Sequence, residues 1–119
     1  MKKIQPLSLV SNLSQFIGTE NYYKNFFGTV YTDGIKYLAE ETNSYWLIDL
    51  VSSYQTNSKV NHESFQVYHI EVVEDTLYIT VTDGRENVLT WKEYEYTDFP
   101  LSNFYLYYVD EVLMLPSEY

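Results

Sequence analysis

The spacing of hydrophobic residues changes near the middle of this 119-residue chain, and this change constrains the fold more than any other feature. Between residues 32 and 55 the hydrophobic residues recur every three to four positions, which is typical of amphipathic helices. From Phe65 onward they recur at every second position among β-branched and aromatic residues, which is typical of strands. The sequence therefore predicts a single domain, residues 1–119, in which 1–60 are mainly helical and 61–119 form mainly antiparallel sheet.

Three helices are predicted in the first half. Residues 8–17 place their hydrophobic side chains on one face, between a serine that can cap the helix and a glycine just beyond its end. Two further helices are expected within 32–55: the first starts at Thr32 or Asp33, either of which can accept backbone N–H bonds, and the second is capped by Asn43 or Ser44. Their expected inner faces consist of Ile35, Leu38, Ala39 and Thr42, and of Leu47, Ile48, Leu50, Val51 and Tyr54. Residues 19–31 fit neither period, so an irregular aromatic connector is expected there, with 28–31 as an alternative short strand.

Five strands are predicted in the second half, after a polar connector at 55–62. They are expected at 65–73, 77–82, 88–96, 104–109 and 112–115. The connectors between them are short, apart from a longer break around Pro100, and short connectors are typical of antiparallel hairpins. The predicted fold is α+β, with the N-terminal helices packed on one face of a four- to five-stranded antiparallel meander sheet.

The alternation of residues predicts which side chains of two strands face the core. In 77–82 it is regular, so Leu77, Ile79 and Val81 are expected inside and the residues between them outside. In 88–96, however, Glu93 and Glu95 share parity with the hydrophobic Leu89 and Trp91. A β-bulge or an exposed strand end is therefore expected there.

The charge of the chain is unevenly distributed. It contains 17 acidic and 7 basic residues, for a net charge of −10, but residues 1–60 hold five of each and residues 61–119 hold twelve acidic and two basic residues. An acidic surface argues against direct binding of nucleic acid or an anionic membrane, because both require basic groups. It favours a basic protein partner. The alternative is that the charge only keeps a tyrosine-rich sheet soluble and protects its edges.

Residues for metal or cofactor chemistry are scarce. The chain has no cysteine, and its two histidines, His62 and His69, stand in no metal-ligand spacing, so neither a metal site nor a cofactor is predicted. No run has transmembrane length, and the basic residues after Met1 are not followed by a signal-peptide hydrophobic region. A cytoplasmic location is expected.

Trp46 and Asp49 are the most distinctive pair within the helical half. Helical spacing places both near the polar edge of the second helix expected within 32–55, where Asp49 is expected to be solvated or hydrogen-bonded. A tryptophan beside a carboxylate on an accessible helix face is suited to recognition. The hypothesis is that the two residues form part of a recognition patch.

Five segments carry a family resemblance. They are Gly-Thr-Glu-Asn-Tyr-Tyr at 18–23, Tyr-Thr-Asp-Gly-Ile-Lys-Tyr-Leu-Ala at 31–39, Tyr-Trp-Leu-Ile-Asp at 45–49, Tyr-Thr-Asp-Phe-Pro at 96–100 and Leu-Pro-Ser-Glu-Tyr at 115–119. In these segments the chain resembles an uncharacterised family of small proteins from bacteria, plasmids and phages. The resemblance implies a domain of unknown function without assigned catalytic residues. It also implies a mobile-element setting, in which small acidic proteins inhibit host defence systems as anti-CRISPR proteins do.

The leading hypothesis is a non-enzymatic interaction protein that docks acidic groups onto a basic surface, such as the nucleic-acid-binding surface of a host defence effector. The predicted partner-binding residues are Glu71, Glu74, Asp75, Glu93, Glu95, Asp98, Asp110 and Glu111, together with Trp46 and Asp49. Two alternatives remain open. One is a small-ligand-binding domain or enzyme with a pocket between helices and sheet, which would use Tyr22, Tyr23, Asp33, Asp49 or His69. The other is a structural module that forms a homodimer through an apolar edge strand or a tyrosine face.

Overall fold

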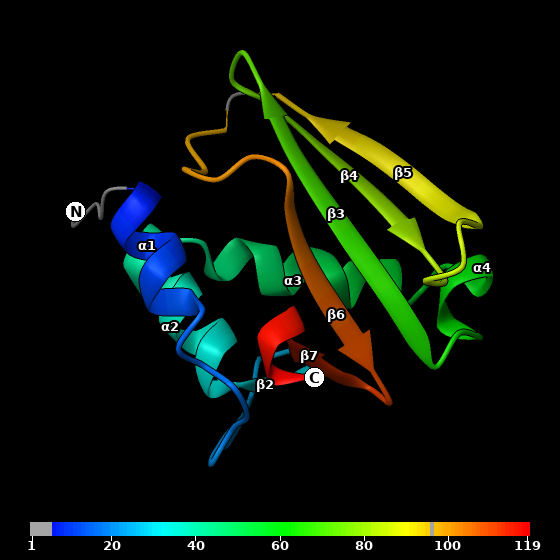
Figure 1. Ribbon diagram of the computed structural model, residues 1–119. Helices are drawn as coiled ribbons and strands as arrows, with labels where there is room; N and C mark the ends of the chain where they lie inside the picture. The colour runs from blue at the N-terminus through cyan, green and yellow to red at the C-terminus, as the bar shows by residue number, and fades with distance from the viewer. Residues whose placement is uncertain (1–5, 96) are drawn as a thin grey trace.

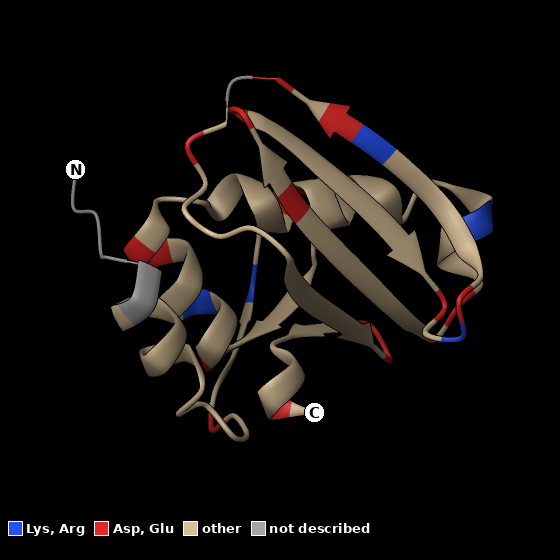
Figure 2. Cartoon of the chain, turned by 45° about the horizontal axis from the view of Figure 1, so that its top comes forward, with Lys and Arg blue, Asp and Glu red and all other residues tan. Residues whose placement is uncertain are grey.

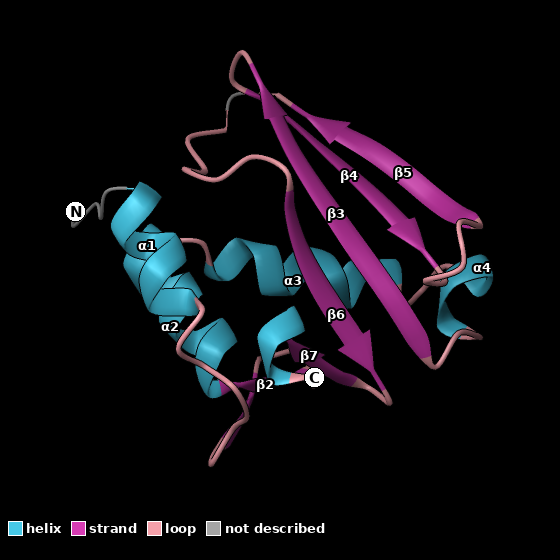
Figure 3. Ribbon diagram, viewed as in Figure 1, coloured by secondary structure: helices cyan, strands magenta, loops and turns pink. Residues whose placement is uncertain are grey.

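The computed structural model describes residues 6–95 and 97–119 and has an α+β fold (Figure 1). Its helices pack against one face of a twisted sheet, and Figure 3 separates the two kinds of element by colour. The helices are α1 (Pro6–Leu13), α2 (Asp33–Thr42), α3 (Tyr45–Tyr54) and α4 (Ser58–Asn61), and a 3₁₀ turn, η1 (Pro116–Glu118), ends the chain. The strands are β1 (Tyr22–Lys24), β2 (Val30–Thr32), β3 (Phe65–Val73), β4 (Thr76–Thr82), β5 (Val88–Tyr94), β6 (Phe104–Val109) and β7 (Val112–Met114).

The strands form one mixed sheet, which corrects the predicted meander. In the described part of the chain the sheet has seven strands in the order β1-β2-β7-β6-β3-β4-β5. Neighbouring strands are antiparallel except for β2 and β7, which are parallel. In a meander β6 would lie beside β5, but it pairs instead with β3, at the other side of the β3–β4 hairpin.

The connector after β5 explains this departure. It crosses the end of the β3–β4 hairpin, where the amide of Thr97 donates to the carbonyl of Asp75 at 2.7 Å. Farther along, the hydroxyl of Ser102 accepts from the amide of Val72 at 3.0 Å and donates to the carbonyl of the same residue at 3.1 Å. The break around Pro100 is therefore a crossover held by hydrogen bonds to the backbone of the β3–β4 hairpin. After this crossover, β6 pairs with the edge of β3 that is not paired with β4.

Two of the seven strands come from the segment predicted to be an irregular connector. β1 and β2 form a hairpin in which Tyr23 pairs with Tyr31, so the short strand expected at 28–31 exists, shifted to Val30–Thr32. Gly28 lies in the turn at a φ of 87°, a conformation that favours glycine. Three-residue strands are too short to show an alternating pattern, which is why the sequence did not reveal β1.

The helices and the covered face of the sheet share one hydrophobic core. The predicted inner residues Ile35, Leu38 and Ala39 are buried on α2, whereas Thr42 is half-buried. On α3 the predicted residues Leu47, Ile48, Val51 and Tyr54 are buried, and Leu50 is half-buried against the core. Leu77, Ile79 and Val81 of β4 are buried beneath these helices, as the alternation predicted.

Other boundaries differ from the predictions for local reasons. The first helix ends at Leu13 and not at residue 17, because the amides of Gln15 and Phe16 turn back to carbonyls three residues earlier. The polar connector at 55–62 contains the short helix α4, capped by the side chain of Asn57. β5 ends at Tyr94, and residue 96 of the predicted strand lies outside the described residues. Within the described residues, no helix is both long and apolar enough to cross a membrane.

A β-bulge resolves the parity conflict in β5. The register shifts between Val81 and Thr82 of the neighbouring strand, so Leu89 turns inward and packs against the core. Trp91 and Glu93 pair with Thr80 and Tyr78, which places them on the sheet face away from the helices. The predicted bulge therefore occurs at the start of the strand. Near the end of the strand, Glu93 lies on the outer face.

Candidate partner-binding site

One end of the sheet gathers most of the predicted acidic residues. The turn between β3 and β4 lies beside the end of β5, because Leu77 pairs with Tyr94. This arrangement brings six exposed carboxylates to one region, the acidic end: Glu71, Glu74, Asp75, Glu93, Glu95 and Asp98. Figure 2 shows acidic residues around the tip of the β3–β4 hairpin and the end of β5.

The structure does not bring Asp110 and Glu111 to the same region. They form the turn between β6 and β7, and the amide of Asp110 donates to the carbonyl of Ser64, just before β3 begins. A nine-residue strand such as β3 is about 30 Å long, so this turn lies at the opposite end of the sheet. The ten predicted residues thus do not form one continuous site.

The two acidic turns have the same unusual backbone. Glu74 and Asp75 have φ values of 48° and 68°, and Asp110 and Glu111 repeat these values. Two consecutive positive φ angles are typical of a type I′ turn, which favours Asn-Gly because glutamate enters this region only at a cost. The acidic residues therefore occupy positions where other residues would give a more stable turn.

Aromatic side chains lie beside the carboxylates on the outer face of the sheet. Glu71 and Glu93 flank Tyr78 across the three strands β3, β4 and β5. One row farther along, the ring of Tyr105 stacks on His69 with centroids 4.4 Å apart, and Trp91 is 61% exposed. Lys92, the only lysine or arginine on β3 to β6, lies on the other face and approaches the ring of Tyr54 at 5.5 Å.

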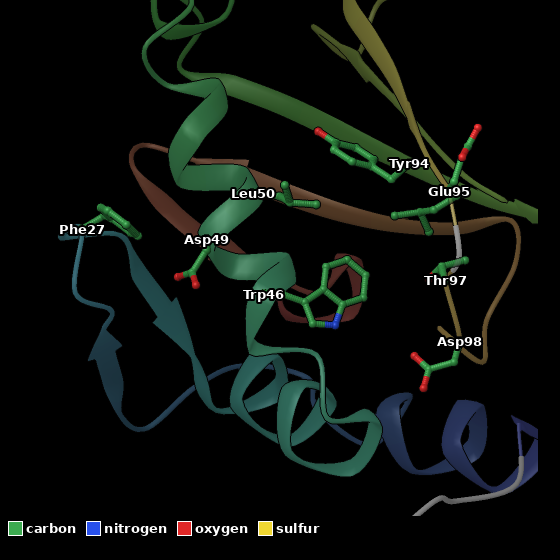
Figure 4. A pocket seen from close by; sticks show the side chains of 9 residues that line it. Phe27, Trp46, Asp49, Leu50, Tyr94, Glu95, Thr97 and Asp98 are labelled. Carbon is green, nitrogen blue, oxygen red and sulfur yellow. The ribbon is translucent and has the colours of Figure 1, made fainter. Parts of the chain in front are cut away.

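Beside the acidic end, a groove opens between α3 and the end of the sheet (Figure 4). Its volume is about 540 Å³, and we call it the α3 groove. Its lining residues are Phe27, Trp46, Asp49, Leu50, Leu77, Tyr94, Glu95, Thr97 and Asp98. Four of them, namely Trp46, Asp49, Glu95 and Asp98, are among the residues predicted from the sequence to bind a partner.

The α3 side of the groove follows from helical spacing. Trp46, Asp49 and Leu50 lie three and four positions apart, on a face next to the buried stripe of the helix. The rings of Trp46 and Phe99 are nearly perpendicular, with a centroid distance of 6.0 Å, and this contact holds the indole against the connector. Asp49 accepts a 3.1 Å hydrogen bond from the side chain of Asn25. As predicted, Asp49 is exposed and hydrogen-bonded.

Asn25 ties the β1–β2 hairpin to α3 and thereby brings an aromatic residue to the groove. Its side-chain amide also donates to Ser52 at 3.0 Å, and its carbonyl oxygen accepts from the amide of Thr29. At the tip of the hairpin, Phe26 and Phe27 are 95% and 66% exposed, and Phe27 lines the groove. Sequence reasoning missed this contribution, although two phenylalanines just before a turn glycine were a signal of exposed aromatic groups.

The opposite wall is formed by β4, the end of β5 and the connector. Leu77 is buried, and the hydroxyl of Tyr94 lies 3.0 Å from that of Tyr54. Burial, followed by the hydrogen bond to Tyr94, raises the pKa of Tyr54 well above its ordinary value, so the Tyr54 hydroxyl stays neutral at physiological pH. Thr97 is held by its bond to Asp75 and accepts in turn from the amide of Phe99. Hydrogen bonds therefore hold both walls.

The residues of the alternative pocket are dispersed. His69 lies on the outer face, where Nε2 is 2.7 Å from the side-chain oxygen of Asn103, and Tyr22 is exposed on β1. Tyr23 donates a 2.8 Å hydrogen bond to Asp33. Of the five residues, Asp49 is the one that lines the α3 groove.

Asp33 has the most perturbed carboxyl group in the described part of the chain. The hydroxyl of Tyr23 and the amides of Glu20 and Asn21 donate to it, and these bonds lower its pKa to about 2. A carboxylate stabilised in this way is a poor proton acceptor near neutral pH. Asp33 therefore anchors the segment before β1 to the start of α2. Among the residues described, no group of three or more metal-ligating side chains could hold a metal ion.

The comparison with protein families matches nearly the whole chain. The family described as "Family of unknown function (DUF6876)" matches residues 8–119. The chain belongs to this family. The match confirms the predicted membership of a family of unknown function, whereas the predicted bacterial, plasmid and phage setting stays a prediction. Searches of curated proteins and of solved structures found no match to the chain.

Proposed function

We propose that this member of the DUF6876 family is a non-enzymatic interaction protein whose acidic end docks onto a basic surface of a partner protein. The observation that supports this proposal is the joining of carboxylates and aromatic groups in one region, with the α3 groove directly beside it. Interfaces of this kind use charge to speed and orient association and aromatic side chains to supply contact energy. A nucleic-acid-binding surface of a host defence effector has the required basic character, so an inhibitor of such an effector is the specific form of the proposal.

The backbone of the β3–β4 turn supports a role for its charges. Glu74 and Asp75 adopt left-handed conformations that Asn-Gly would adopt at lower cost. Residues that persist in unfavourable conformations are often retained for function. The same argument applies to Asp110 and Glu111 at the opposite end, so the turn geometry alone does not select between the two ends. The opposite end also has aromatic side chains, Phe65, Tyr107 and Tyr119, and a pocket of about 450 Å³ beside Asp110 and Glu111. That pocket has no tryptophan or leucine in its lining, whereas the α3 groove has both, and this difference supports the choice of the acidic end.

A symmetric dimer through the outer face fits the structure less well. The face offers Trp91 and Tyr105 as contact area, but Glu71 and Glu93 lie on the same face. Two copies meeting there would bring these carboxylates together, and juxtaposed like charges oppose association. A basic partner would place cationic groups opposite these carboxylates, so this repulsion would not arise.

Affinity capture with two variants of equal charge tests the proposal. The acidic-end variant carries Glu71→Gln, Glu93→Gln, Glu95→Gln and Asp98→Asn. The opposite-end variant carries Asp110→Asn and Glu111→Gln together with Glu63→Gln, just before β3, and Glu86→Gln, in the turn between β4 and β5. Each loses four negative charges, so a difference between them reports on location and not on net charge. We expect the native protein and the opposite-end variant to capture the same basic protein from a lysate of the producing organism, and the acidic-end variant to lose it. Equal capture by both variants would contradict the proposal.

A further inference from the structure

We infer that the α3 groove binds an arginine side chain of the partner protein, an inference that rests on the proposed function. The groove is large enough for this role, because its volume of about 540 Å³ lies within the range of about 300–1,000 Å³ typical of small-molecule sites. Its lining combines apolar and aromatic side chains with carboxylates. That combination matches a side chain that is apolar along its stem and cationic at its tip.

Charge complementarity identifies the occupant as a cation. Asp49 lines the groove from α3 and Glu95 and Asp98 line it from the chain just after β5, and none of the nine described residues in its lining is a lysine or an arginine. Figure 4 shows the Trp46 ring between Asp49 on one side and Asp98 on the other. A cation seated near the indole would therefore meet negative charge from more than one direction.

The aromatic lining favours arginine over lysine. A guanidinium group is planar, so it stacks on an indole face and at the same time donates paired N–H bonds to a carboxylate. An ammonium group is more strongly hydrated and acts as a point charge. Trp46, with Tyr94 on the opposite wall, provides the aromatic surface, and Leu50 and Leu77 contact the stem of an inserted side chain.

The groove also has the properties of an interface anchor. Trp46 packs against Phe99, and Asp49 accepts a hydrogen bond from Asn25, so contacts within the chain hold both side chains. A preformed pocket costs little conformational entropy on binding. Arginine and tryptophan are among the residues most often found at the energetic centre of interfaces.

Titration with defined probes tests this inference. The probes are Nα-acetyl-arginine amide, its lysine counterpart, and its citrulline counterpart, which has the shape of arginine without the charge. The readout is the indole N–H resonance of Trp46 in a ¹H–¹⁵N spectrum of the Trp91→Phe variant, which removes the second tryptophan from the outer face. We expect a saturable shift with arginine, with an affinity about tenfold weaker for lysine and for citrulline.

A second variant keeps the test independent of folding. Asp49→Asn with Glu95→Gln removes two charges, and asparagine retains the oxygen that accepts from Asn25. We expect this variant to keep the native spectrum and to bind the arginine probe severalfold more weakly, whereas Glu63→Gln with Glu86→Gln leaves binding unchanged. No saturable shift, equal affinity for citrulline, or equal affinity for lysine would overturn the assignment.

The two proposals fail in distinguishable ways. If the arginine probe does not bind but the acidic-end variant still loses the captured partner, the arginine site is wrong and the proposed docking stands. If the probe binds but both charge variants capture the same partner equally, the groove binds arginine and the proposed docking surface is wrong.

Discussion

The hydroxyl of Thr32 donates a 2.6 Å hydrogen bond to the Glu118 carboxylate, although the two residues are 86 positions apart. The same carboxylate accepts from the amide of Gly34 in the first turn of α2 and from the amide of Leu115. Glu118 thus ties the C-terminal turn to the beginning of α2. The parallel pairing of β2 with β7 brings these two parts of the chain together.

Loss of this carboxylate is predicted to destabilise the protein. Glu118→Ala leaves the amide of Gly34 without its partner, and bonds to charged acceptors contribute about 1.5–3 kcal/mol each. We expect the free energy of unfolding to fall by about 2 kcal/mol in urea denaturation. Glu118→Gln retains one of the two acceptor oxygens and should destabilise the protein less than Glu118→Ala. Equal stability of Glu118→Ala and the native protein would contradict the role of this contact.

Gly34→Ala is predicted to destabilise the protein even though alanine favours helices. A Cβ at this position would lie 2.6 Å from Oε1 of Glu118 and 2.6 Å from Cδ1 of Leu115, so the carboxylate must move away from its donors. A double-mutant cycle with Glu118→Ala checks this mechanism. The Gly34→Ala change should lower the free energy of unfolding clearly less in the Glu118→Ala background than in the native protein. Additive effects would show that the two residues are not coupled.

Asp33 is predicted to make stability depend on pH in the acid range. Its pKa is about 2 in the folded protein against an ordinary value of 3.8, so the unfolded chain binds a proton first as the pH falls. The contribution of Asp33 is therefore complete above about pH 4 and is lost as the pH approaches 2. Chemical denaturation at several pH values should show a shallower decline across this window for Asp33→Asn. An identical decline in both proteins would contradict the shifted pKa.

The two acidic turns offer a test that separates stability from binding. Replacing Glu74-Asp75 by Asn-Gly relieves two left-handed conformations, and we expect the free energy of unfolding to rise by about 1 kcal/mol. The same replacement of Asp110-Glu111 should stabilise the protein by a similar amount. Partner binding should weaken only for the first variant. If both variants bind the partner as the native protein does, the β3–β4 turn is not part of the interface.

Local patterns were sufficient to predict the main helices and strands. The stripe of Ile35, Leu38 and Ala39 and the alternation of Leu77, Ile79 and Val81 each follow from one short segment, and both are buried as predicted. Strand order does not follow from such patterns. The pairing of β6 with β3 depends on the crossover near Pro100, whose hydrogen bonds join Thr97 and Ser102 to distant backbone groups. The short connectors elsewhere are typical of hairpins between neighbouring strands, so they suggested a meander. They carry no information about this long-range contact.

The candidate site was predictable only in part for the same reason. Helical spacing was enough to place Trp46 and Asp49 together. Their proximity to Glu95 and Asp98 depends on the register of β4 with β5, and the contribution of Phe27 depends on the contact of Asn25 with α3. Charge counting could not distinguish the two ends of the sheet, so it grouped Asp110 and Glu111 with carboxylates that lie about 30 Å away.

The most direct test of acidic docking is the association rate with the purified captured partner, measured at low and raised salt for the native protein and the two charge variants. Long-range attraction between surface charges is screened by salt, with a Debye length of about 10 Å at 0.1 M. We predict that at low salt the acidic-end variant associates about tenfold more slowly than the opposite-end variant, and that raised salt narrows the difference. Equal rates for the two variants, or rates insensitive to salt, would contradict docking through the acidic end.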